Sequence, residues 1–170
     1  MSQYYAGPIN VFSYYLPSEK WDIRFLELAK HISEWSYDPS TRVGAVVAVG
    51  KKVIGVGYNG FSKGVKDLKE RYEDRDLKYK LIVHAEVNAL IMSGEKAQGA
   101  SLYVYPSFSI PSCCSDCAKM IIQYGIREVV GYFPSEDDIE RAKRWSASLE
   151  LSKMMLDEAS VLYRGVKRNG

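Results

Sequence analysis

The sequence contains few of the residues that most often bind transition metals or form disulfides. Its 170 residues include only three cysteines and two histidines. The cysteines, Cys113, Cys114 and Cys117, all fall within five residues. An odd, local cluster of this kind is a poor disulfide framework but a plausible set of metal ligands. With only His31 and His84 available, the chain can supply one metal site of histidine and cysteine.

Other absences exclude whole classes of protein. No apolar run approaches the roughly 18 residues that a membrane-spanning helix needs, and residues 1–5 lack the basic segment that begins a signal peptide. The 23 basic residues are interspersed with 21 acidic ones, so the net charge is +2 and no basic stripe indicates nucleic-acid binding. We therefore expect a cytoplasmic protein with no membrane partner and no nucleic-acid partner.

The length and composition fit one globular domain. An apolar content of 46% and a charged content of 26% are ordinary for a chain with a buried core. Residues 1–17 are rich in tyrosine and interrupted by Pro8 and Pro17, which predicts an irregular N-terminal extension. Residues 18–170 show no internal repeat or linker and are expected to form a single domain.

The periodicity of apolar residues predicts the order of the elements. Ser18 is expected to cap a helix that Pro39 ends, with one apolar face at helical spacing: Trp21, Phe25, Leu28, Ile32 and Trp35. Residues 43–49 and 52–57 are expected to form a hairpin. Further helices are predicted from His84 to before Gly94, over 114–124 and over 135–157, with strands at 101–105, 128–132 and 160–163. The charged stretch 66–80 is predicted to be solvated.

This order is typical of one fold class. A helix, two strands and then alternating helices and strands indicate a mixed sheet covered by helices on both faces. We expect a three-layer α/β/α sandwich with a central mixed sheet of about five strands.

Two short motifs carry the chemistry. His84 and Glu86 begin one predicted helix, and Cys114 and Cys117 begin another. If the two helix ends converge, three protein ligands bind one zinc ion and the fourth position remains for water, as in catalytic zinc sites. Glu86 then lies beside the metal as a candidate general acid and base. His31 has no partner ligand nearby, and we expect it to be structural.

The spacing alone does not say which cysteine pairs with Cys117. Cys114 is three residues away and Cys113 four, and both steps fall on one helical face. A C-x-x-C motif alone is also common in structural zinc ribbons and redox proteins. The combination with H-x-E, in this order, is typical of zinc-dependent nucleobase deaminases.

The chain resembles the deoxycytidylate (dCMP) deaminases of the cytidine deaminase superfamily. The matching stretches lie between about Lys20 and Val166, and they are residues 38–45, 57–60, 84–89, 117–119 and 121–123. The segment Gly57-Tyr58-Asn59-Gly60 is similar to the nucleotide-specific branch, and residues 64–79 resemble bacterial and phage members. The two-residue gap between the family's cysteines favours Cys114 over Cys113.

The resemblance implies a function and further residues. It implies zinc-dependent hydrolysis of dCMP to dUMP and ammonia, which supplies thymidylate synthesis. It implies that Asn59 contacts the sugar and that the main chain at Ala85 holds the pyrimidine. It also implies a homohexamer regulated by dCTP and dTTP. Basic residues available for the phosphate include Arg42, Lys63 and Arg75, and the sequence does not choose among them.

The chain departs from the family pattern in one loop. The family places proline directly before the first cysteine, whereas here Ser112 and Cys113 separate Pro111 from Cys114. The longer loop changes one wall of the pocket, so other substrates remain open: a free base, a nucleoside, C5-modified dCMP or adenosine in tRNA. A zinc-stabilised binding protein without catalysis is a further alternative, although such a protein needs no carboxylate at Glu86.

Overall fold

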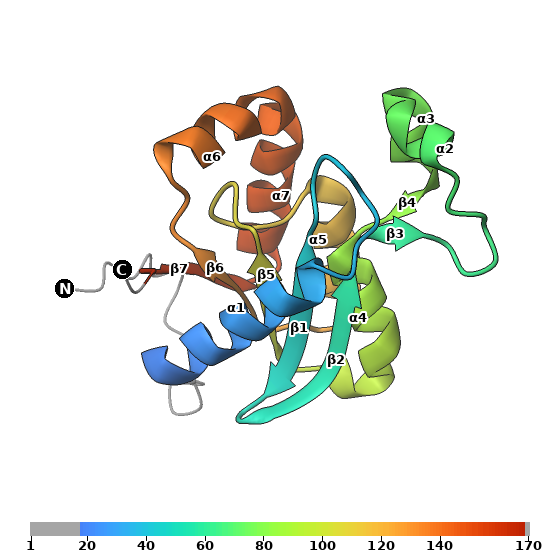
Figure 1. Ribbon diagram of the computed structural model, residues 1–170. Helices are drawn as coiled ribbons and strands as arrows, with labels where there is room; N and C mark the ends of the chain where they lie inside the picture. Colours follow the sequence, from blue (N-terminus) through green and yellow to red (C-terminus); the bar gives the residue numbers. More distant parts are fainter. Residues whose placement is uncertain (1–17, 169–170) are drawn as a thin grey trace.

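The computed structural model describes residues 18–168 of the chain. The predicted N-terminal extension, residues 1–17, lies outside the described residues. The centre is a five-stranded sheet with the strand order β2-β1-β5-β6-β7 (Figure 1). Strand β1 (Gly44–Val49) pairs antiparallel with β2 (Lys52–Tyr58) and with β5 (Ser101–Tyr105). Strands β5, β6 (Glu128–Tyr132) and β7 (Leu162–Val166) are parallel.

Helices cover both faces of this sheet. Successive residues of a strand point to opposite faces, and β1 shows this directly. Val46 and Ala48 pack with helix α1 (Glu19–Ser33) in one buried cluster. Ala45 and Val47 pack in the other cluster, which contains residues of α4 (Ala85–Ser93), α5 (Ser115–Gln123) and α7 (Ser146–Glu158). The predicted three-layer α/β/α fold with a mixed five-stranded sheet is confirmed.

Glycine allows the first turn of α4 to lie directly on β2. A Cβ atom at Gly57 would lie 2.4 Å from the carbonyl oxygen of Ala85 and 2.4 Å from the amide nitrogen of Ala89. Ordinary contacts begin at about 3.4 Å, so no side chain fits between the strand and the helix. The backbone of α4 therefore lies directly against the strand at the end that carries His84 and Glu86.

The first helix is shorter than the sequence predicts. Helix α1 ends at Ser33, six residues before Pro39, and Trp35 is 52% exposed rather than part of the apolar face. The chain leaves the helical path because Ser36 donates a hydrogen bond of 2.7 Å to the carbonyl oxygen of Asn59. This contact draws residues 34–43 toward the loop that follows β2.

The charged stretch also differs from its prediction. It forms two short helices, α2 (Lys69–Glu73) and α3 (Arg75–Leu81), with one buried residue each, Tyr72 and Lys78. The ring of Tyr72 stacks on Phe61 with centroids 4.2 Å apart. Phe61 belongs to β3 (Gly60–Phe61), which pairs with β4 (Ile82–Val83) in a small second sheet. The prediction of a wholly solvated segment is wrong for these two positions.

The predicted helix over 135–157 is divided. Helix α6 (Glu136–Ala142) is followed by a 3₁₀ turn, η3 (Lys143–Trp145), and then by α7. The division turns the Trp145 ring toward Phe108, with centroids 6.0 Å apart. The last strand runs over Leu162–Val166 rather than 160–163 and lies at the sheet edge as expected. Among residues 18–168, no helix combines the length and apolar character required to cross a membrane.

Candidate active site

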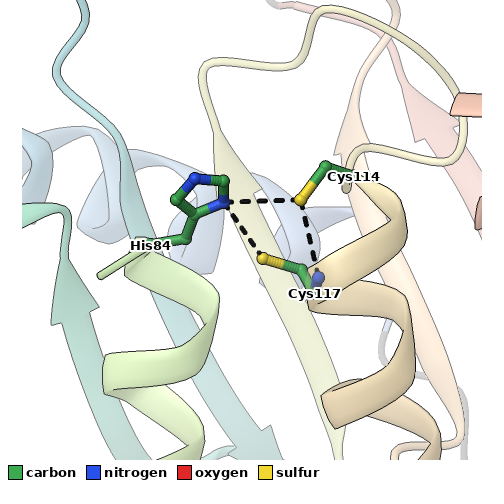
Figure 2. A group of neighbouring side chains, drawn as sticks. All are labelled: His84, Cys114 and Cys117. Atoms are coloured by element: carbon green, nitrogen blue, oxygen red, sulfur yellow. Dashed lines mark hydrogen bonds between the residues drawn. The ribbon is translucent and has the colours of Figure 1, made fainter. Parts of the chain in front are cut away.

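Two helix N-termini meet at the candidate zinc site. His84 is the residue before the first turn of α4, and Cys114 is the residue before the first turn of α5. Each has extended backbone angles, so its side chain turns away from its helix and toward the other. Figure 2 shows the imidazole of His84 directed at both sulfurs. The positive end of each helix favours the thiolate form of a nearby cysteine.

The donor atoms converge as a metal site requires. His84 Nδ1 lies 3.4 Å from Cys114 Sγ and 3.3 Å from Cys117 Sγ (Figure 2). All three donor atoms lie within 4.8 Å of one another, and Cys117 is fully buried. One nitrogen and two sulfurs match the preference of zinc. Three protein ligands leave the fourth position open, which is typical of catalytic rather than structural zinc sites.

The third cysteine lies outside this group. Cys113 Sγ is 3.2 Å from Ser152 Oγ and is buried in the core between the sheet and α7. Burial raises the pKa of the Cys113 thiol to about 12. Cys113 is therefore a neutral, packed thiol at ordinary pH. His31 is exposed on α1, where it lies 3.8 Å from Glu34.

The three candidate zinc ligands shift one another's pKa values. The Cys117 thiol hydrogen-bonds to Cys114, and together with His84 it lowers the pKa of Cys114 to about 4. The same bond and burial raise the pKa of Cys117 well above the ordinary thiol value. The hydrogen bond to Cys114 raises the pKa of His84 to about 9. By themselves, the three side chains thus hold one thiolate, one thiol and one imidazolium at neutral pH.

Glu86 lies in the first turn of α4 at the same place. Its side chain is buried, and burial raises its pKa above the ordinary carboxyl value, although His84 acts in the opposite direction. A carboxyl group with a raised pKa can both accept and return a proton near neutral pH. A structural zinc site has no use for a buried carboxylate beside it.

A cavity of about 350 Å³ opens onto these residues. Five of the six predicted site residues line it: Asn59, His84, Ala85, Glu86 and Cys114; the sixth, Cys117, is buried behind the wall. The opposite wall comes from the long loop after β5 and from the turn before α7, and it includes Phe108, Ser112 and Trp145. A pocket of this size suits a small organic ligand.

Asn59 is held by the backbone of the neighbouring loop. Its Oδ1 accepts a hydrogen bond of 2.8 Å from the Val43 amide, and its Nδ2 donates one of 2.9 Å to the Thr41 carbonyl. An amide side chain has two donors and two acceptor lone pairs. One N–H and one lone pair of Asn59 therefore remain for a ligand.

Sequence reasoning missed several residues of the cavity. Asp38 and Lys78 line it as a buried ion pair, although Lys78 belongs to the stretch predicted to be solvated. Phe108 and Trp145 also line it and carry no motif of their own. Of the three basic residues suggested for phosphate, none lines this cavity; Arg42 lines an adjoining cleft that shares Thr41, Pro106 and Phe108 with it.

Comparison with known proteins places the chain in a family. The profile of the cytidine and deoxycytidylate deaminase zinc-binding region matches residues 19–133. The chain belongs to the cytidine and deoxycytidylate deaminase family. The zinc of this family finds its candidate ligands in His84, Cys114 and Cys117.

Named relatives of this family cover most of the chain. An uncharacterized deaminase from the luxG 3′ region of Aliivibrio fischeri is 35% identical over 144 residues, which are 84% of this chain and 90% of that protein. Human deoxycytidylate deaminase is 31% identical over 154 residues, 85% of this chain and 79% of that protein.

A solved structure shows the same fold. The dCMP deaminase of cyanophage S-TIM5 in complex with dCMP and dUMP matches with a TM-score of 0.60. The match covers 84% of this chain and 93% of that one at 21% identity, a level that shows the fold alone.

Proposed function

We propose that this protein is a deoxycytidylate deaminase that hydrolyses dCMP to dUMP and ammonia. The observation that carries the proposal is the convergence of His84, Cys114 and Cys117 beside a cavity that His84, Cys114 and the buried Glu86 line. The naming of its relatives from several animals as deoxycytidylate deaminases supports the choice of substrate.

The roles of the residues follow from their chemistry. His84, Cys114 and Cys117 hold the zinc ion. When bound, zinc lowers the pKa of water and so supplies a nucleophile at neutral pH. Glu86 takes a proton from the attacking water through its carboxylate and passes it to N3 of the cytosine ring. As the water oxygen bonds to C4, the carboxylate of Glu86 is free to take the second proton from the hydroxyl now on C4. Glu86 delivers this proton to the exocyclic nitrogen, so that the C4–N bond breaks, the C4 carbonyl forms and ammonia leaves.

The cavity walls select the rest of the substrate. The main chain at Ala85 holds the pyrimidine, and the free N–H of the Asn59 amide contacts the sugar. We place the phosphate toward the adjoining cleft, where Arg42 and Arg141 lie. Within residues 18–168 neither guanidinium has a carboxylate oxygen within 4.0 Å. Two such cations can neutralise a phosphate monoester dianion.

Further parts of the proposal rest on the family resemblance and on composition. We propose that residues 18–170 act as one catalytic domain and that the protein works in the cytoplasm, where free cysteines stay reduced. We also propose a homohexamer in which dCTP raises, and dTTP lowers, the affinity for dCMP. Light scattering and dCMP titrations with each effector test these two points; a monomer that ignores both nucleotides would contradict them.

An ammonia-release assay tests the central proposal. The zinc-loaded protein is given dCMP, deoxycytidine, cytosine, C5-methyl-dCMP and a tRNA substrate in parallel. We expect dCMP to have the highest kcat/KM. A higher kcat/KM for deoxycytidine or for free cytosine would contradict the nucleotide assignment, and no ammonia from any of them would favour a zinc-stabilised binding protein.

A further inference from the structure

The cavity wall contains a buried ion pair between segments that are distant in the sequence. Lys78 Nζ lies 3.1 Å and 3.2 Å from the two carboxylate oxygens of Asp38 and 2.5 Å from Ser40 Oγ. The side chains of Lys78 and Asp38 are only 7% and 3% exposed. The family assignment and the proposed reaction give this pair no role.

Lys78 is buried where its neighbours are not. Helices α2 and α3 stand apart from the central sheet (Figure 1), and Lys78 is the one residue of α3 that is buried. A lysine is seldom buried unless it is paired. Its inward position therefore fixes α3 against the loop 38–43, since Lys78 contacts Asp38, 40 residues earlier in the chain.

The ammonium group has little capacity left for a ligand. It has three N–H donors, and three oxygen atoms of Asp38 and Ser40 lie within hydrogen-bond distance. Its charge is balanced by the Asp38 carboxylate at close range. A phosphate group would have to displace Asp38 to reach it, which makes Lys78 a poor phosphate ligand despite its place in the cavity.

Asp38 connects Lys78 to the part of the cavity wall that contains Asn59. Its Oδ1 accepts hydrogen bonds from the Ser40 amide at 2.8 Å and the Thr41 amide at 3.2 Å. The Thr41 carbonyl in turn accepts from Asn59 Nδ2. A continuous path of hydrogen bonds therefore runs from Lys78 through Asp38 and Thr41 to the side chain that we expect to meet the sugar.

We propose that Lys78 is a positioning residue that sets nucleotide affinity by holding the Asp38–Thr41 loop, and with it Asn59, in place. This inference rests on the proposed function of the cavity. Lys78 lies outside the reacting group of His84, Glu86 and the two cysteines. Its loss should weaken substrate binding and leave the chemical step nearly unchanged.

The first test compares Lys78→Met with Lys80→Met, an exposed lysine on the same helix. A misplaced binding wall removes uniform binding energy, so we expect Lys78→Met to raise KM for dCMP at least about tenfold with kcat within about threefold. Lys80→Met should match the wild type. Equal losses in kcat and in zinc content would show a general structural defect and overturn the proposal.

A second variant separates positioning from direct phosphate binding. Asp38→Asn weakens the anchor of Lys78 and of the loop, so positioning predicts a raised KM for dCMP, in the same direction as Lys78→Met. If Lys78 instead bound the phosphate directly, Asp38→Asn would free its ammonium group, and KM would fall or stay unchanged. That result would overturn the proposal.

A third measurement is independent of turnover. Amide hydrogen exchange should be faster across residues 38–43 in Lys78→Met, with unchanged protection in α4 and α5. If Lys78→Met does not fold, Ser40→Ala removes one acceptor of the ammonium group and should give a smaller change of the same kind. Unchanged exchange in the loop would overturn the positioning role, whereas a wild type that ignores dCMP would overturn only the proposed function.

Discussion

Two polar clusters of this protein differ in whether each charged group has a partner of opposite charge within the cluster. Around Arg164, the guanidinium donates to both oxygens of Asp22 at 2.7 and 2.8 Å and to Glu128 at 2.9 Å. The Tyr103 hydroxyl donates a hydrogen bond of 2.9 Å to Asp22, and the Ser101 hydroxyl donates one of 2.5 Å to Glu128. At the zinc site, by contrast, three donor atoms face one point beside an open cavity.

The difference separates a structural cluster from a reactive one. In the Arg164 cluster, each charge has an opposite charge in contact, and the network ties α1 to β5, β6 and β7 on the face away from the cavity. In the site, the side chains of His84, Cys114 and Cys117 hydrogen-bond to one another, the Cys117 amide also donates to Cys114, and the three pKa values are moved far apart. Titratable groups that converge beside a cavity and have strongly shifted pKa values are candidates for a functional site.

The largest effect should come from removing one of the converging donors. Cys114→Ser leaves two strong zinc ligands, and we expect loss of stoichiometric zinc and turnover at background. The matched control is Cys113→Ser, because the Cys113 sulfur faces Ser152 instead of the site. Metal analysis and ammonia release check both variants. Zinc loss in Cys113→Ser with retention in Cys114→Ser would reassign the ligand.

Removing the cation of the Arg164 cluster should reduce stability rather than zinc binding. Arg164→Met leaves Asp22 and Glu128 buried without their shared cation, which costs about 3–5 kcal/mol of unfolding free energy. Urea unfolding measures this loss, and the folded fraction should keep its zinc. As a control, Lys69→Met breaks an exposed pair with Glu73 and should leave the urea midpoint unchanged. A wild-type midpoint for Arg164→Met would show that the cluster adds no stability.

The carboxylate beside the metal should affect only the reaction. Glu86→Gln keeps the size of the side chain and removes its ability to exchange protons. We expect full zinc occupancy and a fall in kcat of at least about 10²-fold, the scale of general acid–base catalysis. Steady-state kinetics with metal analysis test this expectation. Near-normal kcat would remove Glu86 from the mechanism.

The protons that the three candidate ligands hold predict how zinc affinity depends on pH. At pH 7, His84 with a pKa of about 9 is protonated, and Cys114 with a pKa of about 4 is a thiolate. Cys117, with its raised pKa, is a thiol. Zinc needs a neutral imidazole and two thiolates, so binding releases two protons. Affinity should therefore rise about 10²-fold per pH unit between pH 5 and 8.

Competition with a chelator at several pH values measures this slope, and a pH indicator counts the protons released. A slope near zero would mean that the cluster is already deprotonated before the metal binds. The Arg164 cluster supplies the contrast, since its two carboxylates are already held by a guanidinium group at 2.7–2.9 Å.

The features readable from the sequence are those set by neighbouring residues. His84 and Glu86 share one helical turn, as do Cys114 and Cys117, so their spacing alone brings each pair together. The continuous apolar run of β1 likewise predicts a buried strand. These local patterns predict the fold and the two halves of the candidate metal cluster, while the choice of Cys114 over Cys113 comes from the family resemblance.

The missed features depend on contacts between distant segments. The sequence predicts that Lys78 is solvated, because its partner Asp38 is 40 residues away in the chain. The early end of α1 depends on Ser36 meeting Asn59 across 23 residues. The break before α7 brings Ser148 to the Ser115 amide, 33 residues earlier. Neither hydrophobic periodicity nor a capping signal carries information of this kind.

The close approach of α4 to β2 at Gly57 restricts this position to glycine, both in evolution and in engineering. Its hydrogen atom occupies a space where a methyl group would sit 2.4 Å from the Ala85 carbonyl, so α4 would have to retreat by about 1 Å to reach the ordinary 3.4 Å. Zinc–ligand distances vary by only about 0.2 Å. A single methyl group at Gly57 would thus displace His84 by several times the usual variation in a zinc–ligand distance, although Gly57 does not line the cavity. Any transplant of this metal centre into another scaffold must copy the bare strand beneath the helix as well as the ligands.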